Sequence, residues 1–188
     1  MLELASQGAK VLQTRSVALA MNYNVKLQVL SSFENKSGTY IINERQKSME
    51  ETIISGITYT SNEAKITLFN VIDKPGQAAI IFGALADQGI NVDMIVQTST
   101  KDGEATDITF TILKSDILST KKIIENLKNT IKFNNMDEDS KVSKVSVVGS
   151  GMMTKPGVAK TMFKTLADNN INIQVISTSE IKISVLIS

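Results

Sequence analysis

The side chains that most often carry out chemistry at neutral pH are missing from this chain of 188 residues, which contains no histidine and no cysteine. A histidine base, a Ser-His pair, an imidazole or thiolate metal site and a disulfide bond are therefore excluded. Lysine, acidic and tyrosine side chains remain, but the sequence holds neither Gly-x-x-x-x-Gly-Lys-Ser/Thr nor Gly-x-Gly-x-x-Gly, the segments that cradle nucleotide phosphates. These residues favour a binding or regulatory protein over an enzyme that acts alone.

Two Lys-Pro-Gly corners contain the only two prolines, in DKPGQ at 73–77 and TKPGV at 154–158. Proline is tolerated where a helix begins, and the unpaired N–H groups of a first helical turn favour an anion such as an α-carboxylate. Gly76 has no Cβ, so a ligand could come close to the backbone, and Asp73 could bind an α-ammonium group. The first corner therefore predicts a site for a zwitterionic amino acid. Thr154 replaces Asp73 in the second corner, so we expect the first to bind better.

The two corners belong to an internal repeat. With Lys74 placed over Lys155, 11 of 22 gapless positions are identical, where chance would give roughly one or two. Each copy predicts a strand before the corner, a helix after it and two further strands. The ranges are 65–71, 76–88, 90–98 and 106–113 in the first copy, and 144–150, 157–169, 171–179 and 181–188 in the second.

The apolar spacing of both helices predicts a buried stripe, with Ile81 and Phe82 in the first copy matched by Met162 and Phe163 in the second. A further helix over 115–131, with Asp116 as its cap, gives the first copy a β-α-β-β-α order. One more strand would complete the ferredoxin-like split βαβ pattern.

A spare strand at 52–59 precedes the first copy, whereas the second copy stops at Ser188 without its second helix. We expect this strand to complete the second copy's sheet, so that the first unit is inserted in the second. We also expect that the sequence ends before the second unit is complete. The acidic run at 134–141 and the stretch NERQKSMEE at 43–51 are predicted to be solvated linkers.

The segment FNVIDKPGQAAIIFGALADQGINVDMIVQTST, followed by TDITFTIL, resembles an ACT domain, and VVGSGMMTKPGVAKTMFKTLADNNINIQVISTSEIKISVLI resembles the paired second ACT domain of aspartokinases. The first ~42 residues are similar to the end of the amino-acid-kinase catalytic domain in that family. Gln13-Thr14 departs from it, because His-Pro is frequent there. The resemblance implies an α+β fold with two ferredoxin-like βαββαβ ACT domains, at 60–133 and at 49–59 plus 142–188, after a catalytic remnant and linker at 1–48.

The family phosphorylates the side-chain carboxylate of aspartate with ATP, the first step toward lysine, threonine and methionine. The resemblance implies ATP and Mg²⁺ in the complete enzyme. The family's Lys-Phe-Gly-Gly-Thr-Ser phosphate-binding motif does not occur in this chain, so we expect no cofactor here and no turnover by this chain alone. A small regulatory subunit made from an internal start, or a fragment of the C-terminal regulatory part, would explain this.

In ACT domains the effector lies between two domains, and the second strand supplies its other wall. The resemblance implies lysine, threonine or both as effector, with Asp93 as the candidate partner of a lysine ε-ammonium. In the second copy Gln174 takes the place of Asp93. The effector-binding residues that we predict are Asp73, Pro75, Gly76, Gln77, Ala78, Asn91, Val92, Asp93, Gln97, Met153, Thr154, Asn172, Ile173 and Ser179.

The implied partners are a second copy of the chain, joined through the ACT domains, and a catalytic aspartokinase chain. A net charge of +1, few aromatic residues and no long apolar run give no reason to expect nucleic acid or a membrane, and the N-terminus does not read as a signal peptide. We therefore expect a cytoplasmic protein. Two alternatives stay open: an ACT-type sensor of another biosynthetic enzyme, against which STSEIKIS argues, and a ligand-free dimerisation module.

Overall fold

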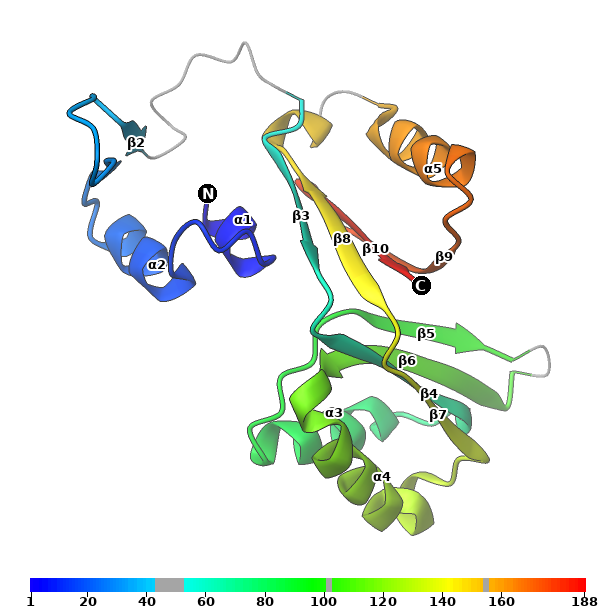
Figure 1. The fold of residues 1–188 in the computed structure, drawn as a ribbon. Coiled ribbons are helices and arrows are strands. Elements are labelled where there is room, and N and C mark those ends of the chain that lie inside the picture. Colours follow the sequence, from blue (N-terminus) through cyan, green and yellow to red (C-terminus); the bar gives the residue numbers. More distant parts are fainter. Residues whose placement is uncertain (43–52, 101–102, 154–155) are drawn as a thin grey trace. The chain divides into compact units, whose positions relative to one another are not determined.

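The computed structural model describes residues 1–42, 53–100, 103–153 and 156–188 (Figure 1). Contacts divide the chain into two compact units, one of residues 1–59, 145–163 and 178–183, the other of residues 60–144, 164–177 and 184–188. The linker predicted at 43–51 lies outside the described residues. None of the described helices has the length and apolar composition needed to cross a membrane.

The N-terminal segment forms two short helices, α1 (Leu2–Ser6) and α2 (Thr14–Asn22), followed by an antiparallel pair of strands, β1 (Leu27–Val29) and β2 (Thr39–Ile41). Val17 on α2 is buried, but many large apolar side chains of this segment are exposed, and Phe33 is 96% exposed.

The first copy is built on an antiparallel sheet of four strands in the order β5-β6-β4-β7. The strands are β4 (Glu63–Ile72), β5 (Ile95–Ser99), β6 (Ala105–Leu113) and β7 (Asn135–Asp139). Helices α3 (Gln77–Asp87) and α4 (Ile117–Ile131) lie side by side on one face of this sheet (Figure 1). The strands and helices predicted for this copy are thereby confirmed.

Both helices bury the predicted stripe against the sheet. Ile81 and Leu85 of α3 and Ile124 and Ile131 of α4 are fully buried in one cluster with the strand residues, and the Phe82 ring meets Phe110 edge-on with 5.5 Å between ring centroids. At ~25 cal/mol per Å² of apolar surface removed from water, this layer is the main favourable term for folding of the copy.

The run at 134–141 was wrongly predicted to be a linker, because most of it forms β7. Asp137 and Asp139 stand opposite Thr67 and Lys65 of β4, and Met136 packs against the core. Charged residues suit this place because β7 is an edge strand, and they protect its free edge from further pairing. The missing strand of the ferredoxin-like pattern is therefore β7.

The prediction that Asp116 caps α4 is also wrong. Asp116 occupies the N-cap position without a capping hydrogen bond from its side chain, since its φ and ψ of −98° and −1° are not extended. Its Oδ1 instead accepts a hydrogen bond from Ser115 Oγ at 3.0 Å. A short 3₁₀ turn, η2 (Lys114–Asp116), leads into the helix.

The sheet of the second copy has the order β3-β8-β10-β9. Its strands are β3 (Gly56–Thr60), β8 (Ser143–Val148), β9 (Ile173–Thr178) and β10 (Lys182–Ile187). The spare strand before the first copy therefore does complete this sheet, as predicted. Between β8 and β9 the chain forms a 3₁₀ turn, η3 (Ser150–Met153), and helix α5 (Val158–Asp168).

The stripe of α5 is less buried than predicted. None of the described side chains of α5 is buried, and Met162 and Phe163 are only half-buried, whereas α3 buries Ile81 and Leu85 completely. The two helices differ in burial because, among the described residues, only one of them has a second helix packed beside it. Helix α3 packs against α4, but the described part of the second copy contains no second helix beside α5.

Candidate functional site

The glycines of the two Lys-Pro-Gly corners have similar backbone geometry. Gly76 immediately precedes α3 with φ +95°, and Gly157 precedes α5 with φ +112°. In both corners the glycine carbonyl accepts an amide hydrogen bond at 3.0 Å, from Ile80 N in the first and Thr161 N in the second. A left-handed φ is the reason for glycine, because a Cβ added to either residue would have no atom within 4 Å among the described residues.

The first corner is open to solvent. Asp73, Pro75 and Ala78 are exposed. The backbone N–H of Asp73 donates to Glu104 O at 3.0 Å, and this hydrogen bond does not involve the side-chain carboxylate. Gln77 is different, because its Oε1 is buried and has no hydrogen-bond partner among the described residues. An unpaired buried acceptor costs free energy that a donor from a ligand, such as an ammonium group, would recover.

The residues that lead into the second strand of the first copy lie at the other end of the sheet from this corner. Asn91, Val92 and Asp93 precede β5, and the N–H of Asp93 donates to Thr111 O at 3.0 Å. Gln97 is exposed on β5, which has β6 as its one neighbour in the sheet. An exposed edge strand can add a further strand, as the pairing of two sheets side by side requires.

Asp73 and Asp93 stand at opposite ends of β4. Asp73 follows its last residue, whereas Asp93 shares the ammonium of Lys144 with Glu63, the first residue of β4. Ten residues at about 3.3 Å each separate these ends by roughly 30 Å. A single amino acid cannot touch both carboxylates within one copy, so the two predicted contacts can share a ligand only across different chains or copies.

Asp93 already pairs with an ammonium group of the chain itself. Lys144 Nζ contacts Asp93 Oδ2 and Glu63 Oε1, and the exposed fractions of the three side chains are 5% for Lys144, 9% for Glu63 and 43% for Asp93. Burial lowers the pKa of Lys144, but the hydrogen bonds and charges of the two carboxylates outweigh it and hold the pKa above its ordinary value of 10.5. Lys144 is therefore a cation beside Asp93 at neutral pH.

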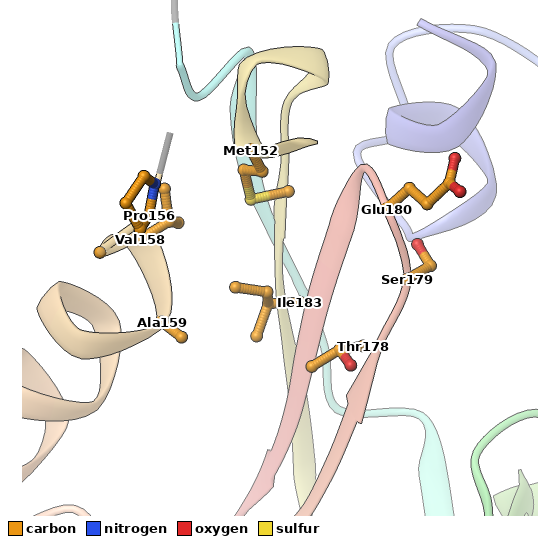
Figure 2. Close-up of a pocket in the computed structure, with 9 residues that line it drawn as sticks. Met152, Pro156, Val158, Ala159, Thr178, Ser179, Glu180 and Ile183 are labelled. Atoms are coloured by element: carbon orange, nitrogen blue, oxygen red, sulfur yellow. The ribbon is translucent and has the colours of Figure 1, made fainter. Parts of the chain in front are cut away.

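A cavity of about 420 Å³ lies at the second corner (Figure 2). Its volume falls within the range of small-molecule sites. Figure 2 shows Met152, Val158 and Ile183 around the space between α5 and the strands, with Thr178, Ser179 and Glu180 at the β9–β10 turn. The lining residues described are Met152, Pro156, Gly157, Val158, Ala159, Thr178, Ser179, Glu180 and Ile183.

Of the residues predicted in the second copy, Ser179 lines this cavity. Asn172 and Ile173 do not belong to the described lining, because they stand at the start of β9 while the corner meets its end. Met153 belongs to η3, and Thr154 lies outside the described residues. The sequence analysis did not predict Glu180 as a site residue, although Glu180 lies in STSEIKIS, the segment that carried the family resemblance.

Comparison with known proteins agrees with this architecture. Residues 65–131 and 145–188 match ACT domain families. The aspartokinase of Helicobacter pylori is 51% identical over 190 residues, with all of this chain and 46% of the relative covered. A crystal structure of aspartokinase alpha and beta subunits is 46% identical, with a TM-score of 0.66, over 72% of this chain and 88% of that chain.

The regulatory subunit of aspartate kinase from Thermus thermophilus, in its ligand-free form, is 34% identical with a TM-score of 0.67, over 72% of this chain and 89% of that one. This chain belongs to the aspartokinase family. It spans about half the length of the curated aspartokinases that it matches. The predicted fold class, two ferredoxin-like ACT domains, is confirmed.

Within the aspartokinase family, the ACT pair of this chain carries two corners of unequal chemistry. The first has the exposed Asp73 carboxylate, and beside it the buried Gln77 Oε1 has no hydrogen-bond partner among the described residues. The second has the defined cavity, whose described lining includes Glu180 at the β9–β10 turn. The prediction that the first corner binds better stays a prediction.

Proposed function

We propose that this chain is the allosteric regulatory part of an aspartokinase and binds the end products L-lysine, L-threonine or both. The observation that carries the proposal is the cavity at the second Lys-Pro-Gly corner, which combines a helix N-terminus, apolar walls and a carboxylate in a member of this family. The proposal includes the domain limits predicted from the sequence, which are ACT domains at 60–133 and at 49–59 plus 142–188 after a catalytic remnant and linker at 1–48. It also implies a cytoplasmic location.

The second corner suits an amino acid in three respects. The first-turn N–H groups of α5, at Val158 and Ala159, have no intrahelical acceptor and favour an α-carboxylate. Met152 and Ile183 offer apolar surface to an aliphatic side chain. Glu180 lies at the β9–β10 turn that borders the cavity, and a rotation of its side chain would bring the carboxylate to an ammonium group, either the α-ammonium or the ε-ammonium of lysine.

The first corner offers the same elements in another arrangement. The N-terminus of α3 favours a carboxylate, and Asp73 together with Gln77 Oε1 can accept hydrogen bonds from an ammonium group. Because β5 is an edge strand of its sheet, a second copy of the chain can pair there and complete the wall of the site. We propose a homodimer built in this way, acting on a catalytic aspartokinase chain.

Regulation then follows from linkage. An effector that binds one arrangement of the ACT domains better shifts the population toward that arrangement. Coupling of about 1–3 kcal/mol would change the affinity of the catalytic domain for its substrates by roughly 5- to 150-fold, and aspartate or ATP would weaken effector binding by the same factor.

Calorimetric titration of the purified chain with L-lysine and L-threonine, singly and together, tests the proposal. We expect heat that saturates at millimolar concentrations or below with at least one of them, and none with their D-enantiomers. A chain that gives no heat with either amino acid across this range would instead be a ligand-free dimerisation module, the alternative favoured by the exposed edge strand β5.

A further inference from the structure

Two pairs of equivalent residues in the repeat make crossed contacts. Lys65 and Lys144 both lie near the start of the first strand of a copy, in KITLFNV and KVSVVGS. Asp93 precedes the second strand of the first copy, and Gln174 takes its place in the second. Lys65 Nζ of the first copy donates to Gln174 Oε1 of the second at 2.5 Å. Lys144 of the second copy donates to Asp93 of the first. All four residues lie in the same compact unit.

The Lys144 contact joins two buried charges, Lys144 and Glu63, to the partly exposed charge of Asp93. Two carboxylates, Asp93 and Glu63, share one ammonium, so the group retains one negative charge. Glu63 Oε2 is buried and has no hydrogen-bond partner among the described residues. Removing one member of such a group leaves another charge buried and uncompensated, which is strongly destabilising.

Asp93 is fixed by its backbone as well as by its charge. Its N–H donates to Thr111 O, and Met94 N donates to Thr111 Oγ1 at 3.2 Å. Beside it, Met94 and four further side chains form a small buried cluster, with Val142, Val175 and Leu186 buried and Val96 packed against them. Residues from both copies therefore meet at the start of β5.

The Lys65 contact joins the equivalent residues of the repeat, but it has one neutral acceptor where Lys144 has two carboxylates. Gln174 is a neutral amide, and its Nε2 donates to Asp139 Oδ2 at 3.2 Å and to Ser188 Oγ at 2.8 Å. A hydrogen bond between a charge and a neutral amide that is partly open to water contributes less than a buried pair of opposite charges. The repeat thus supplies a matched control for Lys144.

We propose that Lys144 is a positioning residue for effector binding, which sets the start of the first copy's second strand by holding Asp93 from the second copy. Lys65 performs the reciprocal task on Gln174 with a smaller effect. The inference rests on the proposed function for its link to the effector, because Asp93 and its neighbours form the strand wall expected to contact it. Through this contact, a change at the first copy's wall is transmitted directly to β8 of the second copy.

The contact itself is tested without any effector, by urea unfolding of Lys144→Met, Asp93→Asn and the double variant. If Lys144 holds Asp93, Asp93→Asn changes the unfolding constant at least tenfold less in the Lys144→Met background than in the wild type. If the two substitutions have additive effects on the free energy of unfolding, Lys144 does not hold Asp93. Glu63→Gln combined with Lys144→Met removes the buried carboxylate along with the lysine and keeps a folded variant available.

The positioning role is tested by calorimetric titration with L-lysine and L-threonine, at a temperature where every variant is folded. We expect the Glu63→Gln/Lys144→Met chain to regain stability relative to Lys144→Met and still bind the effector at least fivefold more weakly than the wild type. Lys65→Met should change the affinity less than twofold. Unchanged affinity in the Lys144 variants would overturn the positioning role. A wild type that binds neither amino acid would overturn the proposed function. In that case the unfolding experiments alone would test whether Lys144 holds Asp93.

Discussion

Both corners need glycine because the backbone there has a positive φ, and not because a side chain would lack space. Gly76 and Gly157 have φ of +95° and +112°, and a Cβ on either would meet nothing within 4 Å among the described residues. Replacing either glycine by alanine should therefore destabilise the chain by about 1–2 kcal/mol through backbone strain alone. Urea unfolding of Gly76→Ala and Gly157→Ala measures this.

Gly83 is the matched control for these substitutions. It lies within α3, likewise has no neighbour within 4 Å of an added Cβ, and does not have a positive φ. Gly83→Ala should raise stability by about 0.5–1 kcal/mol, because alanine is the better helix former. If the three substitutions change the free energy of unfolding equally, the positive φ at the corners does not require glycine.

The acids at the two corners should contribute to effector binding and little to the fold. Asp73 is exposed, and Glu180 lies at a turn on the rim of the cavity. A hydrogen bond to a charged group contributes about 1.5–3 kcal/mol, so Asp73→Ala or Glu180→Gln should weaken effector binding roughly tenfold or more in calorimetric titration. Asp87→Ala, an exposed acid at the other end of α3, serves as the control and should leave the affinity unchanged.

The raised pKa of Lys144 predicts a specific loss of stability in alkali. The group is bound as a cation by Asp93 and Glu63 in the folded chain, so its contribution is complete below its ordinary pKa of 10.5 and is lost as the pH rises through the higher folded value. The melting temperatures of the wild type and of Glu63→Gln/Lys144→Met, measured from pH 8 to 11.5, should converge above about pH 10.5. A difference that stays constant over this range would contradict the cationic role.

Among the elements, β7 shows why hydrophobic periodicity found most strands but not all of them. The other strands of the first copy alternate apolar and polar residues or are mostly apolar, whereas Asn135–Asp139 holds three acids and a single apolar side chain. An edge strand needs only one residue facing the core, so its pattern resembles that of a solvated loop. The missing strand was signalled instead by the count of strands that the fold requires.

If β7 is part of the first copy's fold, Met136→Ala should cost about 1–3 kcal/mol, since this side chain packs against the core. Asp137→Ala, at an exposed position of the same strand, should change the stability by less than about 0.5 kcal/mol. Chemical unfolding distinguishes these values. A Met136 variant as stable as the Asp137 variant would be the behaviour of a linker.

Helices α3 and α5 show the limit of sequence repeats. Their apolar stripes are equivalent, and for α3 the pattern correctly gave the face that is buried against the sheet. It did not give the depth of burial, because that depends on α4, which covers α3 and has no counterpart beside α5 among the described residues. Periodicity reports the side of a helix that is apolar, and packing decides whether another element covers it.

For the molecule as a whole, the repeat located both corners from the sequence but not the groups that face them. Glu180 and Lys144 come near their sites only because particular strand ends meet, and no local pattern encodes that meeting. The same strand geometry separates Asp73 and Asp93 by the length of β4, although the resemblance named both as effector contacts. Topology thus decides which of the predicted residues can act together, and their roles in effector binding stay predictions.

This separation leads to a prediction about assembly. A ligand that touches the corner of one ACT domain and the second strand of another requires two domains to meet, and β5 is a free edge at which a second chain can pair. An effector bound across such an interface must strengthen it, because ligand binding and association are linked by mass action. Sedimentation velocity of the chain at low micromolar concentration should therefore show a larger share of dimer with saturating L-lysine or L-threonine than without. Lysine at the same concentration in its D-form controls for ionic strength, and a distribution unchanged by an effector that calorimetry shows to be bound would place the whole site within one chain.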